Sequence, residues 1–175
     1  DEVHDVYAGW REVFNSYDPP RMAVAEAWVP THRRPRYASP EGLGQAFNFD
    51  LLTAPWSADQ FRNVITENLA LATASGSSTT WVLSNHDVVR HPTRFGGGQL
   101  GLDRARAGTL LMFALPGGAY VYQGEELGLP QAHVPYDRLV DPEAIANWPQ
   151  TLGRDGARTK QLFADGVELA GAAPG

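Results

Sequence analysis

Polar side chains that could do chemistry stand at the ends of three short apolar runs of this sequence. They are Glu26, the triplet Asn85-His86-Asp87, and the segment 123–126 (Gln-Gly-Glu-Glu). A carboxylate at the end of an apolar strand is costly to bury unless it is paired or functional. Two acids on different strands of one sheet therefore suggest acid/base chemistry on a bond held between them.

Each of these groups also has a plain structural explanation when it is taken singly. Glu26 is as well explained as a surface residue at a strand end, and His86 with Asp87 as a structural hydrogen-bonded pair. The two glutamates of the segment 123–126 more often satisfy loop backbone or an arginine. A metal site on His86 and Asp87 needs a third ligand at matching spacing, and no other histidine supplies one. The sequence predicts neither a metal nor a cofactor.

The elements that must position these groups alternate between helix and strand. Apolar residues recur at helical spacing over 5–17, 58–74 and 103–115, and short apolar runs indicate strands over 22–29, 45–52, 80–84 and 119–123. Asp50 is expected at the tip of the second strand, and Ser57 is expected to cap the second helix. Segments 31–44 and 92–101 are expected to be loops, with room for a short helix in the first. This alternation predicts an α/β fold with a parallel sheet, either open or an arc of a barrel.

The composition narrows the classes of function. The chain has 175 residues, 43% hydrophobic and 19% charged, which is a globular composition. A net charge of -6 argues against nucleic acid or an anionic membrane as the main partner. No apolar stretch approaches the roughly 20 residues that span a bilayer. Cysteine is absent, which excludes disulfides and thiolate metal sites and fits a cytoplasmic protein.

Four segments, in chain order, carry recognisable motifs. Segment 26–29 (Glu-Ala-Trp-Val) resembles the third conserved region of glycoside hydrolase family 13, the α-amylase family, and segment 85–90 (Asn-His-Asp-Val-Val-Arg) resembles its fourth. Segment 122–129 (Tyr-Gln-Gly-Glu-Glu-Leu-Gly-Leu) is similar to the eighth-strand end of the α-glucosidase and oligo-1,6-glucosidase branch. Segment 153–159 (Gly-Arg-Asp-Gly-Ala-Arg-Thr) resembles a stretch that follows the barrel in that branch.

This resemblance implies a (β/α)8 barrel and a retaining hydrolase of α-linked glucosides. Glu26 would be the general acid/base, which protonates the glycosidic oxygen and then deprotonates the incoming water. Asp87 would hold sugar hydroxyls and stabilise the oxocarbenium-like transition state, and His86 would hydrogen-bond the same sugar. Arg154 or Arg158 would bind the non-reducing glucose, with a surface salt bridge as the alternative.

The family's nucleophile has no counterpart in this sequence. It is an Asp in a Gly-Phe-Arg-x-Asp-like segment on the fourth strand, and neither Asp50 nor Asp87 is an obvious substitute. A whole barrel needs about 200 to 250 residues. Residues 1–158 are therefore expected to be the C-terminal half of the catalytic domain, roughly strands five to eight, and residues 159–175 a divergent, disordered tail. We expect the isolated chain to be inactive and to self-associate through exposed strand edges.

Several alternatives stay open beside this interpretation. Trehalose synthase and sucrose isomerase share these motifs, so hydrolysis and isomerisation are not distinguished. Phe47 or Phe49 would line the sugar pocket, although core packing is the favoured role. A non-catalytic barrel relative, such as the ectodomain of an amino-acid transporter heavy chain, is disfavoured by Glu26 and the intact Asn-His-Asp triplet. A truncated or frameshifted reading frame would account for the tail.

Overall fold

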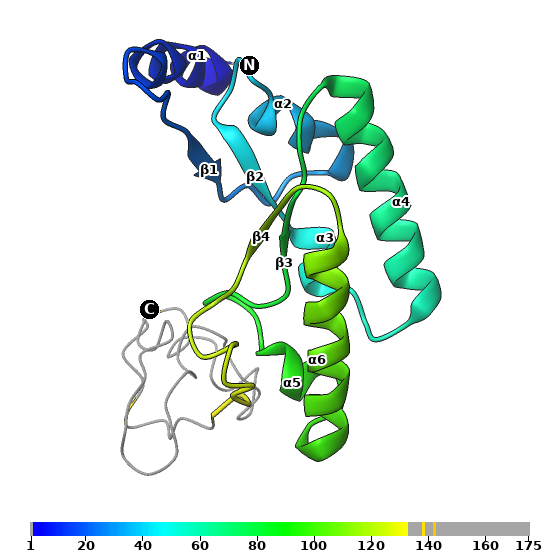
Figure 1. Cartoon of the computed structure of the whole chain (residues 1–175). Coiled ribbons are helices and arrows are strands. Elements are labelled where there is room, and N and C mark those ends of the chain that lie inside the picture. The colour runs from blue at the N-terminus through cyan, green and yellow to red at the C-terminus, as the bar shows by residue number, and fades with distance from the viewer. Residues whose placement is uncertain (1, 133–137, 139–141, 143–175) are drawn as a thin grey trace. The chain divides into compact units, whose positions relative to one another are not determined.

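Four parallel strands form the sheet of the computed structural model, which describes residues 2–132, 138 and 142. The strand order is sequential, β1-β2-β3-β4, and every neighbouring pair is parallel (Figure 1). The strands are β1 (Ala23–Ala25), β2 (Gly44–Asn48), β3 (Thr80–Val82) and β4 (Gly118–Tyr120). Parallel neighbours require a crossover between them, so the predicted α/β alternation is confirmed.

Helices fill the crossovers. They are η1 (Thr31–Arg33), α2 (Arg34–Ala38), α3 (Phe49–Thr53), α4 (Ala58–Ser75), α5 (His91–Arg94) and α6 (Gly98–Ala114), while α1 (Glu2–Asn15) precedes the first strand. Helix α4 confirms the predicted helix over 58–74 and its cap, because Ser57 Oγ accepts a hydrogen bond from the Gln60 N–H at 3.4 Å. Gly76 ends the helix at a φ of 63°, which glycine adopts without strain.

Two sequence predictions about local structure are wrong. Asp50 is not at a strand tip, because β2 ends at Asn48, whose side-chain oxygen accepts the Leu51 N–H at 3.0 Å and starts α3. The segment 31–44, for which a loop with room for a short helix was predicted, contains the short helices η1 and α2. The expected loop 92–101 contains α5 and the first turn of α6, and Pro92 lies in the first turn of α5, where its missing N–H costs no hydrogen bond.

The centre of the sheet is packed around Trp81 of β3. This side chain is fully buried, and its indole N–H donates to the Pro116 carbonyl at 2.8 Å. The turn that leads into β4 brings backbone against backbone, because the Gly118 N–H donates to the Thr79 carbonyl at 2.9 Å. Gly117 lies in this turn at a φ of 116°, and a Cβ there would overlap the Thr79 carbonyl oxygen. Position 117 therefore requires glycine.

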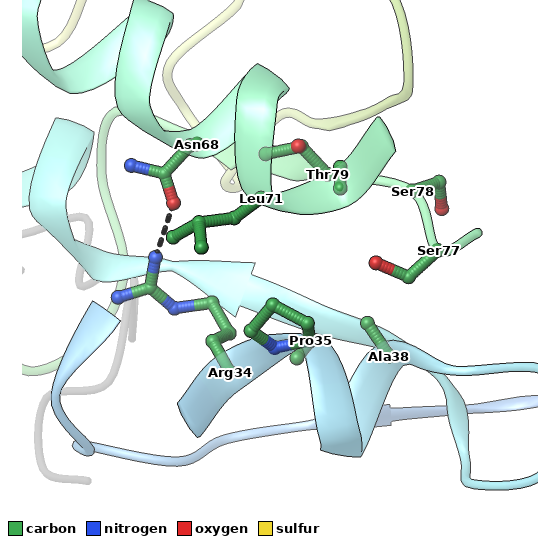
Figure 2. A pocket seen from close by; sticks show the side chains of 10 residues that line it. Arg34, Pro35, Ala38, Asn68, Leu71, Ser77, Ser78 and Thr79 are labelled. Carbon is green, nitrogen blue, oxygen red and sulfur yellow. Dashed lines mark hydrogen bonds between the residues drawn. The ribbon is translucent and has the colours of Figure 1, made fainter. Parts of the chain in front are cut away.

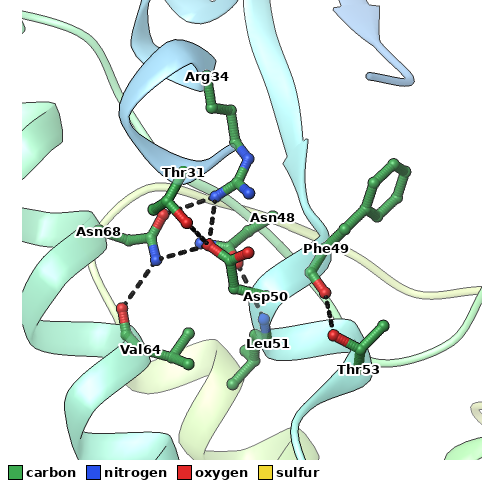
Figure 3. A network of polar contacts seen from close by, with 9 residues as sticks. All are labelled: Thr31, Arg34, Asn48, Phe49, Asp50, Leu51, Thr53, Val64 and Asn68. Atoms are coloured by element: carbon green, nitrogen blue, oxygen red, sulfur yellow. Dashed lines mark hydrogen bonds and ion pairs between the residues drawn. The ribbon is translucent and has the colours of Figure 1, made fainter. Parts of the chain in front are cut away.

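A buried polar network ties the helices around β2 together (Figure 3). Asp50 Oδ2 accepts hydrogen bonds from Arg34 at 2.9 Å, from Thr31 at 3.0 Å and from Asn68 at 3.2 Å. Burial raises the pKa of the Asp50 carboxyl, but these donors outweigh burial and the pKa lies below its ordinary value. Asp50 therefore joins η1, α2, α3 and α4 as an ionised group.

Helix α1 has apolar residues on two sides. Tyr7 and Phe14 pack against a cluster of Ala25, Tyr37 and neighbouring core residues. On the other side the apolar face is open to solvent and comprises Val3, Val6, Trp10, Val13 and Tyr17, each more than 40% exposed. The apolar face predicted over residues 5–17 is therefore mostly exposed to solvent, and Phe14 packs against the core.

The described residues divide into two compact units. The first comprises residues 2–82 and 112–120 and holds the whole sheet with α1 to α4. The second comprises residues 83–111 and 121–132 and holds α5, most of α6 and the loop after β4. Within the described residues, every helix is too short or too polar to cross a bilayer.

Candidate active site

Glu26 lies in the first unit, directly after the carboxyl end of β1. Its side chain is exposed to solvent. Two residues further on, Trp28 stacks on Phe49 with ring centroids 4.1 Å apart and the planes at 22°. Phe49 is 3% exposed, which confirms core packing as its role, whereas Trp28 remains 56% exposed. An exposed indole face of this kind is a stacking surface for an apolar or sugar ring.

Phe47 continues this aromatic surface toward the other side of the sheet. Its ring lies 6.0 Å from the Phe49 ring and meets the Tyr120 ring edge-on at 5.0 Å. The Tyr120 hydroxyl donates to the Gln45 side-chain oxygen at 2.8 Å, which holds the edge strand β4 against β2 residues. The row of aromatic rings therefore runs from Trp28, two residues after Glu26, through Phe49 and Phe47 to Tyr120 of β4.

Asn85, His86 and Asp87 lie in the second unit, on the loop that follows β3. Asn85 Oδ1 accepts the backbone N–H groups of Asp87 at 2.9 Å and Val88 at 3.0 Å, which closes a tight turn. His86 Nε2 lies 3.6 Å from Asp87 Oδ1, with the two side chains 37% and 18% exposed. The structure thus brings His86 and Asp87 together on a turn that Asn85 shapes.

Two of the motif segments contact each other within this second unit. The Arg90 guanidinium donates to the Gln123 carbonyl at 2.8 Å and lies 5.1 Å from the centre of the Tyr122 ring. The Arg90 backbone N–H donates to the Gln131 side chain at 2.9 Å. Arg90 is 2% exposed, so the resemblance motifs at 85–90 and 122–129 share a buried anchor.

A buried cluster under this loop escaped the sequence analysis. Ser84 Oγ lies 2.8 Å from His91 Nδ1 and accepts the His91 backbone N–H at 3.0 Å, and Glu125 Oε1 lies 3.8 Å from the same ring nitrogen. Burial lowers the pKa of His91 to about 3 and raises the pKa of Glu125 to about 7. A serine that ends a fully apolar run and a histidine that precedes Pro92 were the signals available in the sequence.

The cavity of the first unit has a different character. It measures about 20 Å³, which is room for one water molecule, and it lies between α2 and α4 (Figure 2). Arg34, Asn68 and Leu71 contribute to its wall, together with residues 77–79, which precede β3. It therefore lies toward the amino end of β3 and cannot hold a sugar ring.

The predicted site residues are thus distributed over the two units. Glu26 follows β1 in the first unit, while His86 and Asp87 form one group in the second unit. Both segments come after the carboxyl ends of parallel strands, the edge at which α/β proteins place their active sites. The other two predicted residues, Arg154 and Arg158, lie outside the described residues.

A parallel α/β sheet with acidic residues after two of its strands is the architecture of an α/β enzyme. The family model described as alpha amylase, catalytic domain, matches residues 1–172. The chain belongs to this family, which confirms the resemblance at the family level.

Curated relatives of the chain are α-glucosidases. A salivary alpha-glucosidase of Anopheles gambiae is 30% identical over 179 residues, which cover 95% of this chain and 29% of that protein. A probable alpha-glucosidase of Rhizobium meliloti is 44% identical over 84 residues, which cover 47% of this chain and 15% of that protein. The chain therefore spans less than a third of the length of these two relatives.

Solved structures show the same fold. An alpha-glucosyl transfer enzyme, XgtA, superimposes with a TM-score of 0.77 at 32% identity, covering 99% of this chain and 32% of that one. The trehalulose synthase MutB of Pseudomonas mesoacidophila gives 0.73 at 23% identity, covering 97% of this chain and 36% of that one, and this likeness concerns the fold alone.

Proposed function

We propose that the chain is part of a retaining α-glucosidase of the α-amylase family, which acts on α-linked gluco-oligosaccharides. The observation that carries this proposal is the family match over residues 1–172 together with the motifs at 26–29 and 85–90 in family order. The curated relatives named alpha-glucosidase support this branch. The chain would supply the C-terminal half of the barrel, residues 1–158, followed by a divergent tail.

Glu26 is proposed as the general acid/base. It follows a strand of the parallel sheet directly, and the exposed face of Trp28 two residues later offers a surface against which a sugar ring can stack. In the first step the Glu26 carboxyl gives its proton to the glycosidic oxygen, while a nucleophilic carboxylate supplied from outside this chain bonds to the anomeric carbon and the glycosidic bond breaks. In the second step the carboxylate takes a proton from the attacking water, which releases the sugar with its configuration retained.

Asp87 and His86 are proposed to hold the sugar at the reacting end. Asp87 Oδ1 and His86 Nε2 are 3.6 Å apart, so two neighbouring sugar hydroxyls can hydrogen-bond to both side chains at once. A carboxylate near the anomeric carbon stabilises the positive charge of the oxocarbenium-like transition state. Arg154 or Arg158 is proposed to bind the non-reducing glucose.

The nucleophile is proposed to be absent from this chain, because the sequence contains no Gly-Phe-Arg-x-Asp-like segment. Retaining glycosidases need a second carboxylate about 5 Å from the acid/base. Asp50, the acid on the segment after β2, is no substitute, because its carboxylate accepts hydrogen bonds from Arg34, Thr31 and Asn68. The 175-residue chain is therefore proposed to be inactive by itself. We further propose that it is cytoplasmic and that it has no cofactor, nucleic-acid partner or membrane partner.

Glucosyl transfer is the second candidate, favoured by the likeness to the alpha-glucosyl transfer enzyme at 32% identity. Hydrolysis and transfer share the acid/base and the covalent intermediate and differ in whether water or a sugar hydroxyl attacks. Trehalose synthase and sucrose isomerase chemistry is the intramolecular version of this transfer. Chromatography of the products formed from maltose separates glucose release from new disaccharides.

The test is hydrolysis of nitrophenyl α-glucoside by the purified chain, alone and mixed with the N-terminal half of a related α-glucosidase. We expect activity only when the two halves are mixed, and Glu26→Gln should lower that activity about 10²–10⁴-fold. Glu12→Gln, an exposed acid of α1, is the matched control and should leave activity unchanged. Hydrolysis by the unmixed chain would refute the missing nucleophile. A folded chain that stays silent in the mixture would refute the proposed function.

A further inference from the structure

The loop that carries Asp87 is closed at its base by a reciprocal pair of hydrogen bonds. Residues 85–89 lie between Ser84 and the start of α5, and Ser84 Oγ both accepts the His91 backbone N–H at 3.0 Å and meets His91 Nδ1 at 2.8 Å. Ser84 and His91 are each 1% exposed. A second bond spans the same loop, because the Arg94 guanidinium donates to the Leu83 carbonyl at 2.7 Å.

The direction of the bond between Ser84 and the His91 ring follows from the ring's surroundings. Burial, together with the cations of Arg94 and Arg90, lowers the pKa of His91 to about 3, although a hydrogen bond to the Ala105 backbone opposes them. The ring is therefore neutral and has a single donor N–H. Because the Ala105 carbonyl takes that donor, Nδ1 is the acceptor and the Ser84 hydroxyl donates to it.

Glu125 lies against this pair from the loop that follows β4. Its Oε2 accepts the Tyr122 backbone N–H at 3.1 Å, while its Oε1 is 3.8 Å from His91 Nδ1 and buried without a hydrogen-bond partner among the described residues. Burial raises the pKa of Glu125 to about 7, opposed by the Tyr122 bond and the cations of Arg90 and Arg94, and reinforced by Glu126. Glu125 thus lies beside the acceptor nitrogen of His91, just beyond hydrogen-bond distance.

We propose that Ser84, His91 and Glu125 are positioning residues, a buried clasp that fixes the loop 85–89 and through it the orientation of Asp87. This inference rests on the proposed function, because it gives Asp87 a role toward substrate. A clasp is favoured over ordinary core packing because Ser84 and His91 are polar, 1% exposed and hydrogen-bonded across the base of one loop, with the buried Glu125 beside them. Apolar residues would fill the same space at lower cost.

The test is amide hydrogen exchange and nitrogen chemical shifts of the 175-residue chain in solution. In the unmodified chain, His91 Nδ1 should have the shift of an unprotonated acceptor at neutral pH. Ser84→Ala should speed exchange at Asp87 and Val88 at least tenfold more than elsewhere, and Ser84→Thr should restore protection. A protonated Nδ1, or exchange that rises equally everywhere in Ser84→Ala, would overturn the clasp.

Two comparisons separate positioning from stability and from sugar binding. Asp50→Asn removes a buried ion pair in the other unit, and it should destabilise the chain without selective exchange at 87 and 88. In a His86→Gln background, which removes the titratable ring of the loop itself, Glu125→Gln should abolish any shift of the loop amides between pH 5 and 8, and a persisting shift would exclude Glu125 from the clasp. Addition of methyl α-glucoside then tests the proposed function separately. If the Asp87 resonances do not change on addition while the clasp is intact, the role of Asp87 in sugar binding is refuted and the clasp is not.

Discussion

Asp50 and Glu125 show how the same chemical group is given opposite properties by its neighbours. Asp50 receives hydrogen bonds from three side chains, one of them a guanidinium, and its pKa falls below the ordinary value although burial acts to raise it. Glu125 receives one backbone N–H on one oxygen, and burial raises its pKa to about 7. Deeper burial and fewer donors together raise the pKa of Glu125, whereas shallower burial and three donors lower that of Asp50.

Stability should therefore respond to pH through Glu125. Its folded-state pKa of about 7 lies above the ordinary 4.5, so the folded chain binds the proton more tightly and loses stability as pH rises between these values. Glu125→Gln removes this loss and should stabilise the chain by up to roughly 3 kcal/mol at pH 8, with little change at pH 4. Urea unfolding at both pH values measures the difference, and equal effects at the two pH values would contradict it.

Removal of the Asp50 carboxylate should be among the most harmful single changes in the first unit. Asp50→Asn leaves the Arg34 guanidinium, 5% exposed, without its ionic partner, which should cost about 3 kcal/mol in denaturant unfolding. Asp59→Asn breaks an ion pair with Arg62 whose side chains are more than two thirds exposed and should cost little. Because the Asp50 pKa is lowered, its contribution should vanish as pH falls below about 4. Similar losses for both variants would argue against a structural role for the network.

Among the secondary-structure elements, those with strong local patterns could be predicted from the sequence. Helix α4 has helical periodicity, a serine cap and a closing glycine, and its bounds were predicted to within a residue. Strand β2 was predicted too long, because the apolar residues Phe49 and Leu51 continue the strand-like pattern into α3. The decisive feature was the Asn48 cap, a local hydrogen bond that periodicity does not detect.

The turn before β4 is the element most sensitive to a single methyl group. Gly117→Ala would place a Cβ against the Thr79 carbonyl oxygen, and alanine would have to adopt a φ of 116°, which is unfavourable for any residue with a Cβ. The substitution should therefore destabilise the chain by at least about 2 kcal/mol. Gly9→Ala is the matched control, since a Cβ there meets no atom within 4 Å and helix α1 should gain roughly 0.5–1 kcal/mol. Thermal unfolding of both variants is the measurement. A neutral Gly117→Ala would mean that the turn can rearrange.

The residues of the candidate site could be predicted from the sequence, whereas the buried residues that hold its loop in place could not. Glu26, His86 and Asp87 carry motifs that the sequence presents directly, and the structure places each after a strand of the parallel sheet. The supporting contact between Ser84 and His91 spans seven residues, and that between His91 and Glu125 spans more than thirty. Such contacts depend on tertiary packing, so no local pattern indicates them.

At the scale of the whole molecule, two kinds of exposed surface are expected to promote self-association of the chain. The sheet ends in β1 and β4, which each pair with one neighbour only among the described strands, and α1 exposes Val6, Trp10 and Val13. We expect concentration-dependent association in sedimentation velocity, weakened by Trp10→Glu with Val13→Lys on the exposed face. A monodisperse monomer at all concentrations would contradict this expectation.

The burial of Trp81 gives the first unit an optical signature. Trp10 and Trp28 are about half exposed, whereas Trp81 is shielded completely, with its indole N–H held by the Pro116 carbonyl. In a chain with Trp56 and Trp148 replaced by phenylalanine, an aqueous quencher such as iodide should therefore quench the emission of Trp10 and Trp28 and leave a blue-shifted component from Trp81. The strand at the centre of the sheet thus carries its own fluorescent reporter of native packing, readable without any label.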